Sequence, residues 1–160
     1  MTPALLIDIA LVPAFRFLPP EMDSLAARAF LLTVVQQESR LRHRRQIHGP
    51  ARSYFQFERA GVRAVLGHLA SAEHARRACA LLDVEPTTDA VYLAIEHHDV
   101  LACIFARLLL WTLPGKLPQE HEPDLAWSQY LSAWRPGKPH RSTWDGFFIE
   151  AWRIVKEAEL

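Results

Sequence analysis

Apolar residues recur at helical spacing through most of the chain, in segments separated by proline and glycine. Spacings of three, four and seven residues place side chains on one face of an α-helix. No convincing run of alternating β-branched residues predicts a strand. The pattern therefore predicts an all-α fold of about six helices, at roughly 24–47, 58–69, 72–82, 88–111, 124–134 and 143 to the C-terminus.

The N-terminal segment 1–20 is apolar but resembles neither a signal peptide nor a membrane span. It lacks a basic leading region and a small-residue cleavage site, and Asp8 interrupts its apolar run. The run is also too short to cross a bilayer. We expect an extended or short helical arm packed on a single domain formed by 21–160, with no membrane insertion and no secretion signal.

Two predicted helices carry an ionisable residue on an otherwise apolar face. Glu38 lies four residues after Val34 and three before Leu41, on the stripe of the first long helix. His98 interrupts the comparable stripe of the helix predicted at 88–111. Polar residues at core positions are rare unless they are paired or functional, so Glu38 and His98 are the first candidates for a site.

A glutamate surrounded by apolar groups loses solvation, which favours its protonated form and raises its pKa. Such an acid can protonate a leaving-group oxygen, as glycosidic bond cleavage requires. Periodicity alone favours another interpretation, in which Glu38 is a helix-end residue that is exposed or paired with Arg40, Arg42 or Arg45. The neighbouring residues decide between the two.

Glu38-Ser39, followed eighteen residues later by Gln56 at the end of "GPARSYFQ", resembles the signature of the lysozyme-like lytic transglycosylases. The family has a Glu-Ser pair and then a "GARGLMQ"-type stretch that ends in glutamine at this spacing. The likeness covers residues 30–60 well. Ala51 and Arg52 match the stretch, whereas the chain departs from its Gly, Gly, Leu and Met at Pro50, Ser53, Tyr54 and Phe55.

The later helices resemble the family more loosely. "HHDVLACIFARLLL" is similar to a family helix with Asn and Gly, which are His98 and Ala102 here. The family's "AYNAG" segment is not present. "AWSQYLSAWRPGKP" occupies the expected region, and Tyr130 is the best substitute for the family's tyrosine.

The resemblance implies a lysozyme-like domain with a cleft for peptidoglycan glycan strands, and no cofactor. Glu38 would cleave the bond between N-acetylmuramic acid and N-acetylglucosamine, leaving a 1,6-anhydro product. Ser39 would orient Glu38 or polarise the pocket, and Gln56 and Tyr130 would hold a sugar or the catalytic carboxyl. Tyr54 and His98 complete the expected substrate-binding residues.

Several alternatives remain open for these residues. Ser53-x-x-Gln56 also matches a capping box, and Tyr130 also suits a core. A muramidase would use water in place of the sugar hydroxyl, with Glu58, Asp99 or Asp124 as an unranked second carboxylate. A catalytically inactive phage structural or assembly protein would have the same fold without the activity.

The chain also resembles short proteins encoded among phage tail genes that carry this domain. That likeness implies synthesis in the bacterial cytoplasm, action at the cell wall, and other virion proteins as partners.

Charge and cysteine content narrow the functional classes further. Lysine plus arginine and aspartate plus glutamate number 18 each, which argues against a dedicated nucleic-acid binder. The cluster "RLRHRR" keeps that function open, but cations also suit a helix C-terminus. No HExxH or CxxC motif predicts a metal site. Cys79 and Cys103 suit buried positions, and Trp127, Trp134 and Trp144 suit either sugar stacking or a core.

Overall fold

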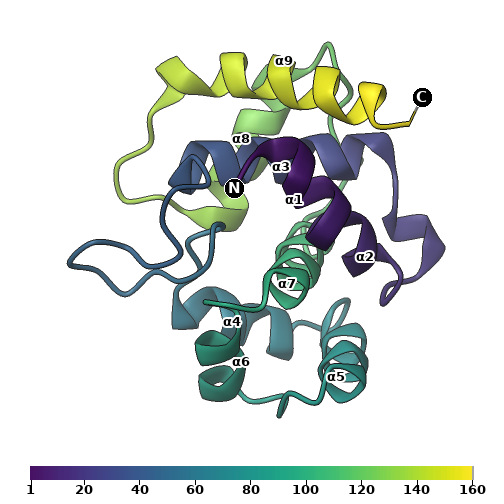
Figure 1. Cartoon of the computed structure of the whole chain (residues 1–160), viewed down its shortest axis with the longest axis vertical. Coiled ribbons are helices and arrows are strands. Elements are labelled where there is room, and N and C mark those ends of the chain that lie inside the picture. Colours follow the sequence, from purple (N-terminus) through teal and green to yellow (C-terminus); the bar gives the residue numbers. More distant parts are fainter. Residues whose placement is uncertain (160) are drawn as a thin grey trace.

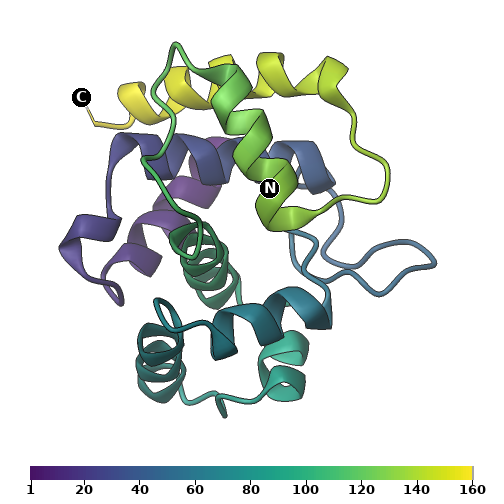
Figure 2. The ribbon, with the colours of Figure 1, turned by 180° about the vertical axis from the view of Figure 1, so that it is seen from behind.

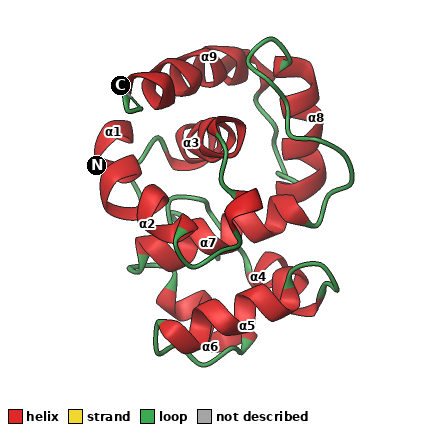
Figure 3. Ribbon diagram, turned by 90° about the vertical axis from the view of Figure 1, so that its right-hand side faces the viewer, coloured by secondary structure: helices red, strands yellow, loops and turns green. Residues whose placement is uncertain are grey.

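The computed structural model describes residues 1–159, which form helices joined by loops (Figure 3). In this part of the chain the β-structure is limited to isolated bridges, Arg45 to Arg52 and Arg52 to Phe57. The all-α class is therefore confirmed. The elements are α1 (Pro3–Leu6), the π-helix η1 (Ile7–Leu11), α2 (Val12–Phe15), the 3-10 helix η2 (Pro20–Met22), α3 (Leu25–Ser39), α4 (Arg59–Gly67), α5 (Ala72–Leu81), α6 (Thr88–Ala94), α7 (Asp99–Trp111), α8 (Pro123–Trp134) and α9 (Arg141–Glu157).

Helix α7 forms the centre of the molecule. Helices α4, α5 and α6 gather on one side of it, and α3, α8, α9 and the N-terminal helices lie on the other (Figures 1 and 2). Every residue from Leu101 to Leu110 is buried, including Arg107. A helix that is apolar on nearly all faces must be enclosed, so α7 joins the two groups of helices.

Helices α3 and α9 make the most extensive helix pair. Phe30 of α3 meets Trp144 of α9 edge to face, with ring centroids 6.0 Å apart. The hydroxyl of Ser24 accepts a hydrogen bond from the Ala27 N–H at 3.1 Å and so caps α3 at the predicted start. This packing fixes α3, whose last turn carries Glu38.

The N-terminal segment is a helical arm, in agreement with one of the two predicted forms. Leu6, Leu11 and Phe15 are buried against the rest of the core, and the arm contacts α7 and α9. No helix among residues 1–159 combines the length and the apolar character needed to cross a lipid bilayer. Cys79 and Cys103 are buried free thiols, as predicted.

The first long helix ends earlier than its sequence predicts. Helix α3 stops at Ser39 rather than near Ile47, because Arg40 and Leu41 adopt left-handed conformations with φ of 51° and 56°. Neither residue is a glycine, which is the usual sequence signal for this conformation. The "RLRHRR" cluster therefore lies in an irregular segment, residues 40–57, which we call the 40–57 loop.

The helix predicted at 88–111 is divided into α6 and α7. Ile95–His98 separate the two helices, and the Nδ1 atom of His98 accepts a hydrogen bond from the Leu101 N–H at 3.2 Å. His98 thus caps the start of α7 and does not continue an apolar stripe. Histidine is not a favoured capping residue, so the break has little signal in the sequence.

Candidate active site

Glu38 lies in the last turn of α3, at a pocket of about 400 Å³ between α3 and the 40–57 loop. Its side chain is partly buried. The pocket is lined by Gln37, Glu38, Ser39, Arg40, Arg42, His43, Gln46, Ile47 and Gln56. Glu38 is the single carboxylate in this lining, so any chemistry that needs a carboxyl group here depends on it.

Tyr130 of α8 holds the Glu38 carboxyl group. Its hydroxyl donates a hydrogen bond to Glu38 Oε1 at 2.6 Å, across 92 residues of sequence. The Tyr130 ring is stacked on Trp144, with centroids 4.7 Å apart and planes at 27°. Trp127 and Trp134 lie 5.3 Å and 6.3 Å from the same ring. The tyrosine is therefore fixed by packing, and it fixes the position of the carboxyl group in turn.

Burial raises the pKa of Glu38 to about 7, against an ordinary value of 4.5. The hydrogen bond from Tyr130 opposes this shift because it favours the ionised form, but the loss of solvation is the larger effect. Burial and the neighbouring Glu38 raise the pKa of Tyr130, so its hydroxyl remains a donor. The carboxyl group can thus both release and accept a proton near neutral pH.

The 40–57 loop is held by backbone and side-chain contacts on three sides. Arg52 and Phe57 exchange backbone hydrogen bonds of 2.8 Å and 2.7 Å. The Trp134 indole N–H donates to the Phe55 carbonyl at 3.0 Å, which joins the loop to α8. Arg45 and Arg52 each lie 2.9 Å from a carboxylate oxygen of Glu96, which precedes α7. In Figure 2 the loop accordingly lies beside the lower end of α8 and the start of α4.

Gln56 reaches the pocket because its backbone is left-handed, with φ of 53°. Its side-chain nitrogen donates to the Ser53 carbonyl at 2.7 Å. The capping box that Ser53 and Gln56 suggested does not form, because both residues precede α4, which begins at Arg59. Gln56 instead lines the pocket from the loop side, with its side-chain nitrogen bonded within the loop.

Ser39 lines the pocket, but its hydroxyl is engaged with the backbone. It donates to the Val35 carbonyl at 3.1 Å and accepts from the Leu41 N–H at 3.2 Å. The latter bond supports the left-handed turn after α3. Ser39 therefore shapes the end of the helix and does not hydrogen-bond to Glu38.

Tyr54 and His98 are not brought to Glu38. Tyr54 is buried, and the Arg44 guanidinium lies over its ring at 4.5 Å from the centroid. His98 caps α7, and neither residue belongs to the lining of the pocket. Trp144 is fully buried and belongs to the core, whereas Trp127 and Trp134 are only partly buried.

The arginines of the 40–57 loop fall into two groups. Arg44 pairs with Asp99 through a hydrogen bond of 2.7 Å, and Arg45 and Arg52 share Glu96, so two acids compensate two of these three positive charges. Arg40 and Arg42 line the pocket beside Glu38. The sequence predicts Arg40 and Arg42 on a helix, and the cluster of positive charge after Glu38 is the only sequence feature that indicates a role for them in a site.

The three alternative acids do not join Glu38 in the pocket lining. Asp99 is bound by Arg44, and Asp124 is bound by Arg141 at 2.7 Å. Glu58 is exposed and precedes α4. Among residues 1–159 no cluster of three or more His, Cys, Asp or Glu side chains is suited to a metal ion.

Comparisons with protein-family models, with curated proteins and with solved structures found no match for the chain.

Proposed function

We propose that the protein cleaves peptidoglycan glycan strands as a lytic transglycosylase, with Glu38 as its acid and base. The observation that carries the proposal is the Glu38–Tyr130 pair at the pocket. It combines a carboxyl group whose pKa burial raises to about 7 with a hydrogen bond of 2.6 Å that orients it. The sequence resemblance at Glu38-Ser39 and Gln56 supports the same activity.

The reaction would use one proton in two steps. Protonated Glu38 donates to the glycosidic oxygen, and the bond from that oxygen to the anomeric carbon of N-acetylmuramic acid breaks. The resulting Glu38 carboxylate then takes the proton of the 6-hydroxyl group as this oxygen attacks the anomeric carbon. The 1,6-anhydro ring closes, no water is consumed, and Glu38 recovers its proton.

The lining of the pocket supports a mechanism without a second catalytic carboxylate, and the sequence resemblance supports the 6-hydroxyl group as the nucleophile. A two-carboxylate glycosidase positions its second acid opposite the first, across the bond that breaks. Here Glu38 is the only carboxylate among the lining residues, and Asp99 and Asp124 form ion pairs with arginines. An enzyme with one carboxylate can rely on the acetamido group of the substrate and on its 6-hydroxyl group. In line with the resemblance to phage tail-gene proteins, we place this activity at the bacterial cell wall.

The test is mass analysis of the muropeptides released from purified cell walls. Wild-type protein should release 1,6-anhydro-muropeptides, and Glu38→Gln should lower the rate by about 10²–10⁴-fold, the usual contribution of a general acid. Glu73→Gln, which changes an exposed glutamate on α5, is the matched control and should retain the rate. Reducing muropeptides would instead indicate a muramidase. Failure of wild-type protein to release any product would leave only the scaffold and contradict the proposal.

A further inference from the structure

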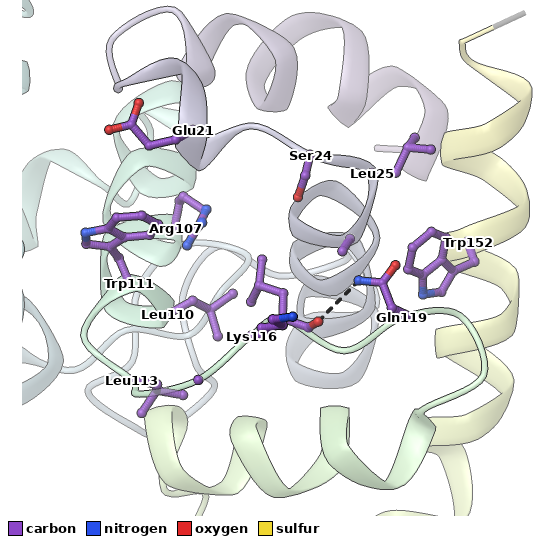
Figure 4. Close-up of a pocket in the computed structure, with 13 residues that line it drawn as sticks. Glu21, Ser24, Leu25, Arg107, Leu110, Trp111, Leu113, Lys116, Gln119 and Trp152 are labelled. Carbon is purple, nitrogen blue, oxygen red and sulfur yellow. Dashed lines mark hydrogen bonds between the residues drawn. The ribbon is translucent and has the colours of Figure 1, made fainter.

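A second and larger cavity, of about 700 Å³, lies away from Glu38 and shares no lining residue with its pocket. It is bounded by the start of α3, the end of α7, α9 and the segment that joins α7 to α8 (Figure 4). Leu25, Leu110 and Leu117 give it apolar walls. This volume is typical of a pocket for a small organic molecule.

One wall of the cavity carries a buried arginine, Arg107, that has no ion-pair partner among residues 1–159. Arg107 is only 3% exposed, and its Nε atom donates to the Met22 carbonyl at 2.8 Å. Its terminal nitrogens make no hydrogen bond within residues 1–159, and the Trp111 ring lies 5.1 Å from the guanidinium carbon. Asp23, the acid that acts on Arg107 through its charge, is bound by both oxygens to Arg28 at 2.8 Å.

An isolated buried cation is costly, because its lost hydration is recovered only through an anion or through hydrogen-bond acceptors. Burial accordingly lowers the pKa of Arg107 to about 10. The cavity beside Arg107 gives an anion access to the two free nitrogens. The geometry alone thus marks this position as incomplete without a negative partner.

Trp152 of α9 lines the cavity on the opposite side. Its indole N–H is itself buried and has no hydrogen-bond partner among residues 1–159, so the ring and not this donor borders the cavity. Figure 4 shows Arg107 and Trp152 on opposite sides, with Ser24 between them and Leu110 below Arg107. The cavity therefore has a charged donor at the Arg107 end, and apolar walls that continue to the Trp152 ring at the other.

We propose that this cavity binds an organic monocarboxylate with an apolar body, such as a medium-chain fatty acid. The planar guanidinium of Arg107 suits the two oxygens of a carboxylate. The lining also includes the exposed residues Glu21 and Lys116, whose opposite charges offset each other. The buried charge of Arg107 therefore balances a monoanion, whereas a dianion would leave a negative charge uncompensated. The apolar chain lies along Leu25, Leu110 and Leu117, toward Trp152. This site is independent of the chemistry assigned to Glu38.

The test is titration of the ¹⁵N-labelled protein with decanoate and with decanol, followed by the indole resonance of Trp152. Decanoate should bind saturably at one site and at least tenfold more tightly than decanol, which has the same chain without the charge. Trp152→Phe identifies the resonance by removing it. Equal affinity for the two molecules would overturn the proposal.

Variants separate the carboxylate site from nonspecific apolar binding. Arg107→Met should keep the fold, because an apolar residue of similar size replaces an unpaired cation, and should weaken decanoate at least tenfold while leaving decanol unchanged. If Arg107→Met does not fold, competition by inorganic phosphate in the wild-type protein decides the question. Phosphate that displaces decanoate at equal concentration overturns the monocarboxylate assignment, and phosphate that fails to do so supports it. Arg153→Met, which changes an exposed arginine on α9, is the control and should bind decanoate normally.

Discussion

At the scale of single residues, burial of the Glu38 carboxyl group makes the stability of the protein depend on pH. Its pKa is raised from 4.5 to about 7 by burial, so the folded protein holds a proton that the unfolded chain has already released. Folding stability therefore decreases as the pH rises from about 4.5 to about 7, and it is constant above that range. The whole shift corresponds to at most about 3 kcal/mol.

Glu38→Gln should remove this dependence, because the amide is neutral at every pH and its oxygen can still accept the Tyr130 hydrogen bond. We expect the variant and the wild type to have similar free energies of unfolding near pH 4. Above pH 8 the variant should be more stable by up to about 3 kcal/mol. Urea denaturation across this pH range measures the difference, and Glu73→Gln should show none that grows with pH. A constant difference for Glu38→Gln would mean that folding does not shift the pKa of Glu38.

Tyr130→Phe tests the partner of the acid. The Tyr130 hydrogen bond lowers the pKa of Glu38, so its removal should raise that pKa further and move the alkaline limb of glycan cleavage to higher pH. The rate should also fall, by roughly tenfold or more, because the carboxyl group loses its orientation. The pH profile of muropeptide release measures both effects. Tyr92→Phe removes the hydroxyl that donates to the Pro50 carbonyl, and it should leave the limb in place.

At the scale of elements, the sequence predicts most helices but not the interruptions that build the site. Helices α4, α5, α8 and α9 begin and end within a few residues of their predicted bounds, because Pro, Gly and Ser stand at their ends. The sequence does not predict the end of α3, because Arg40 and Leu41 are left-handed without a glycine, in a turn supported by the hydrogen bond from the Leu41 N–H to the Ser39 hydroxyl. The α6–α7 break was missed because His98 is an unusual cap.

Arg40→Gly should stabilise the protein by about 0.5–1 kcal/mol, since glycine adopts the left-handed conformation without a steric penalty. Arg40→Ala removes the same side chain but keeps the penalty, so it should not be more stable than the wild type. Urea denaturation of the three proteins separates backbone strain from the loss of charge. Equal stability of the Gly and Ala variants would show that Arg40 is not strained.

At the scale of the whole molecule, the N-terminal arm completes the enclosure of α7. Leu11 is 1% exposed, whereas Ile9 in the same π-helix is 49% exposed. Leu11→Ala should lower the free energy of unfolding by about 2–4 kcal/mol through lost burial and a residual cavity. Ile9→Ala is the matched control and should change it by less than about 0.5 kcal/mol. Similar losses in the two variants would contradict the packing of the arm.

Long-range pairing limits what the sequence reveals about the sites. Helical periodicity singled out Glu38, but its contact with Tyr130 joins distant helices and followed only from the family resemblance. No feature of the sequence predicts the cavity at Arg107, because an arginine within an apolar helix does not indicate which loop will pack against that arginine. A buried arginine needs a negative or hydrogen-bonding partner. Only the structure shows that the terminal nitrogens of Arg107 lack one among residues 1–159.

The tryptophans around Tyr130 should make the intrinsic fluorescence of the protein sensitive to the charge of Glu38. Trp127, Trp134 and Trp144 all lie next to the ring that binds Glu38, and indole emission responds to charge in its surroundings. Ionisation of this one carboxyl group should therefore alter the intrinsic fluorescence of the native state. Tryptophan fluorescence measured against pH would then report the ionisation of Glu38 without substrate and without a label.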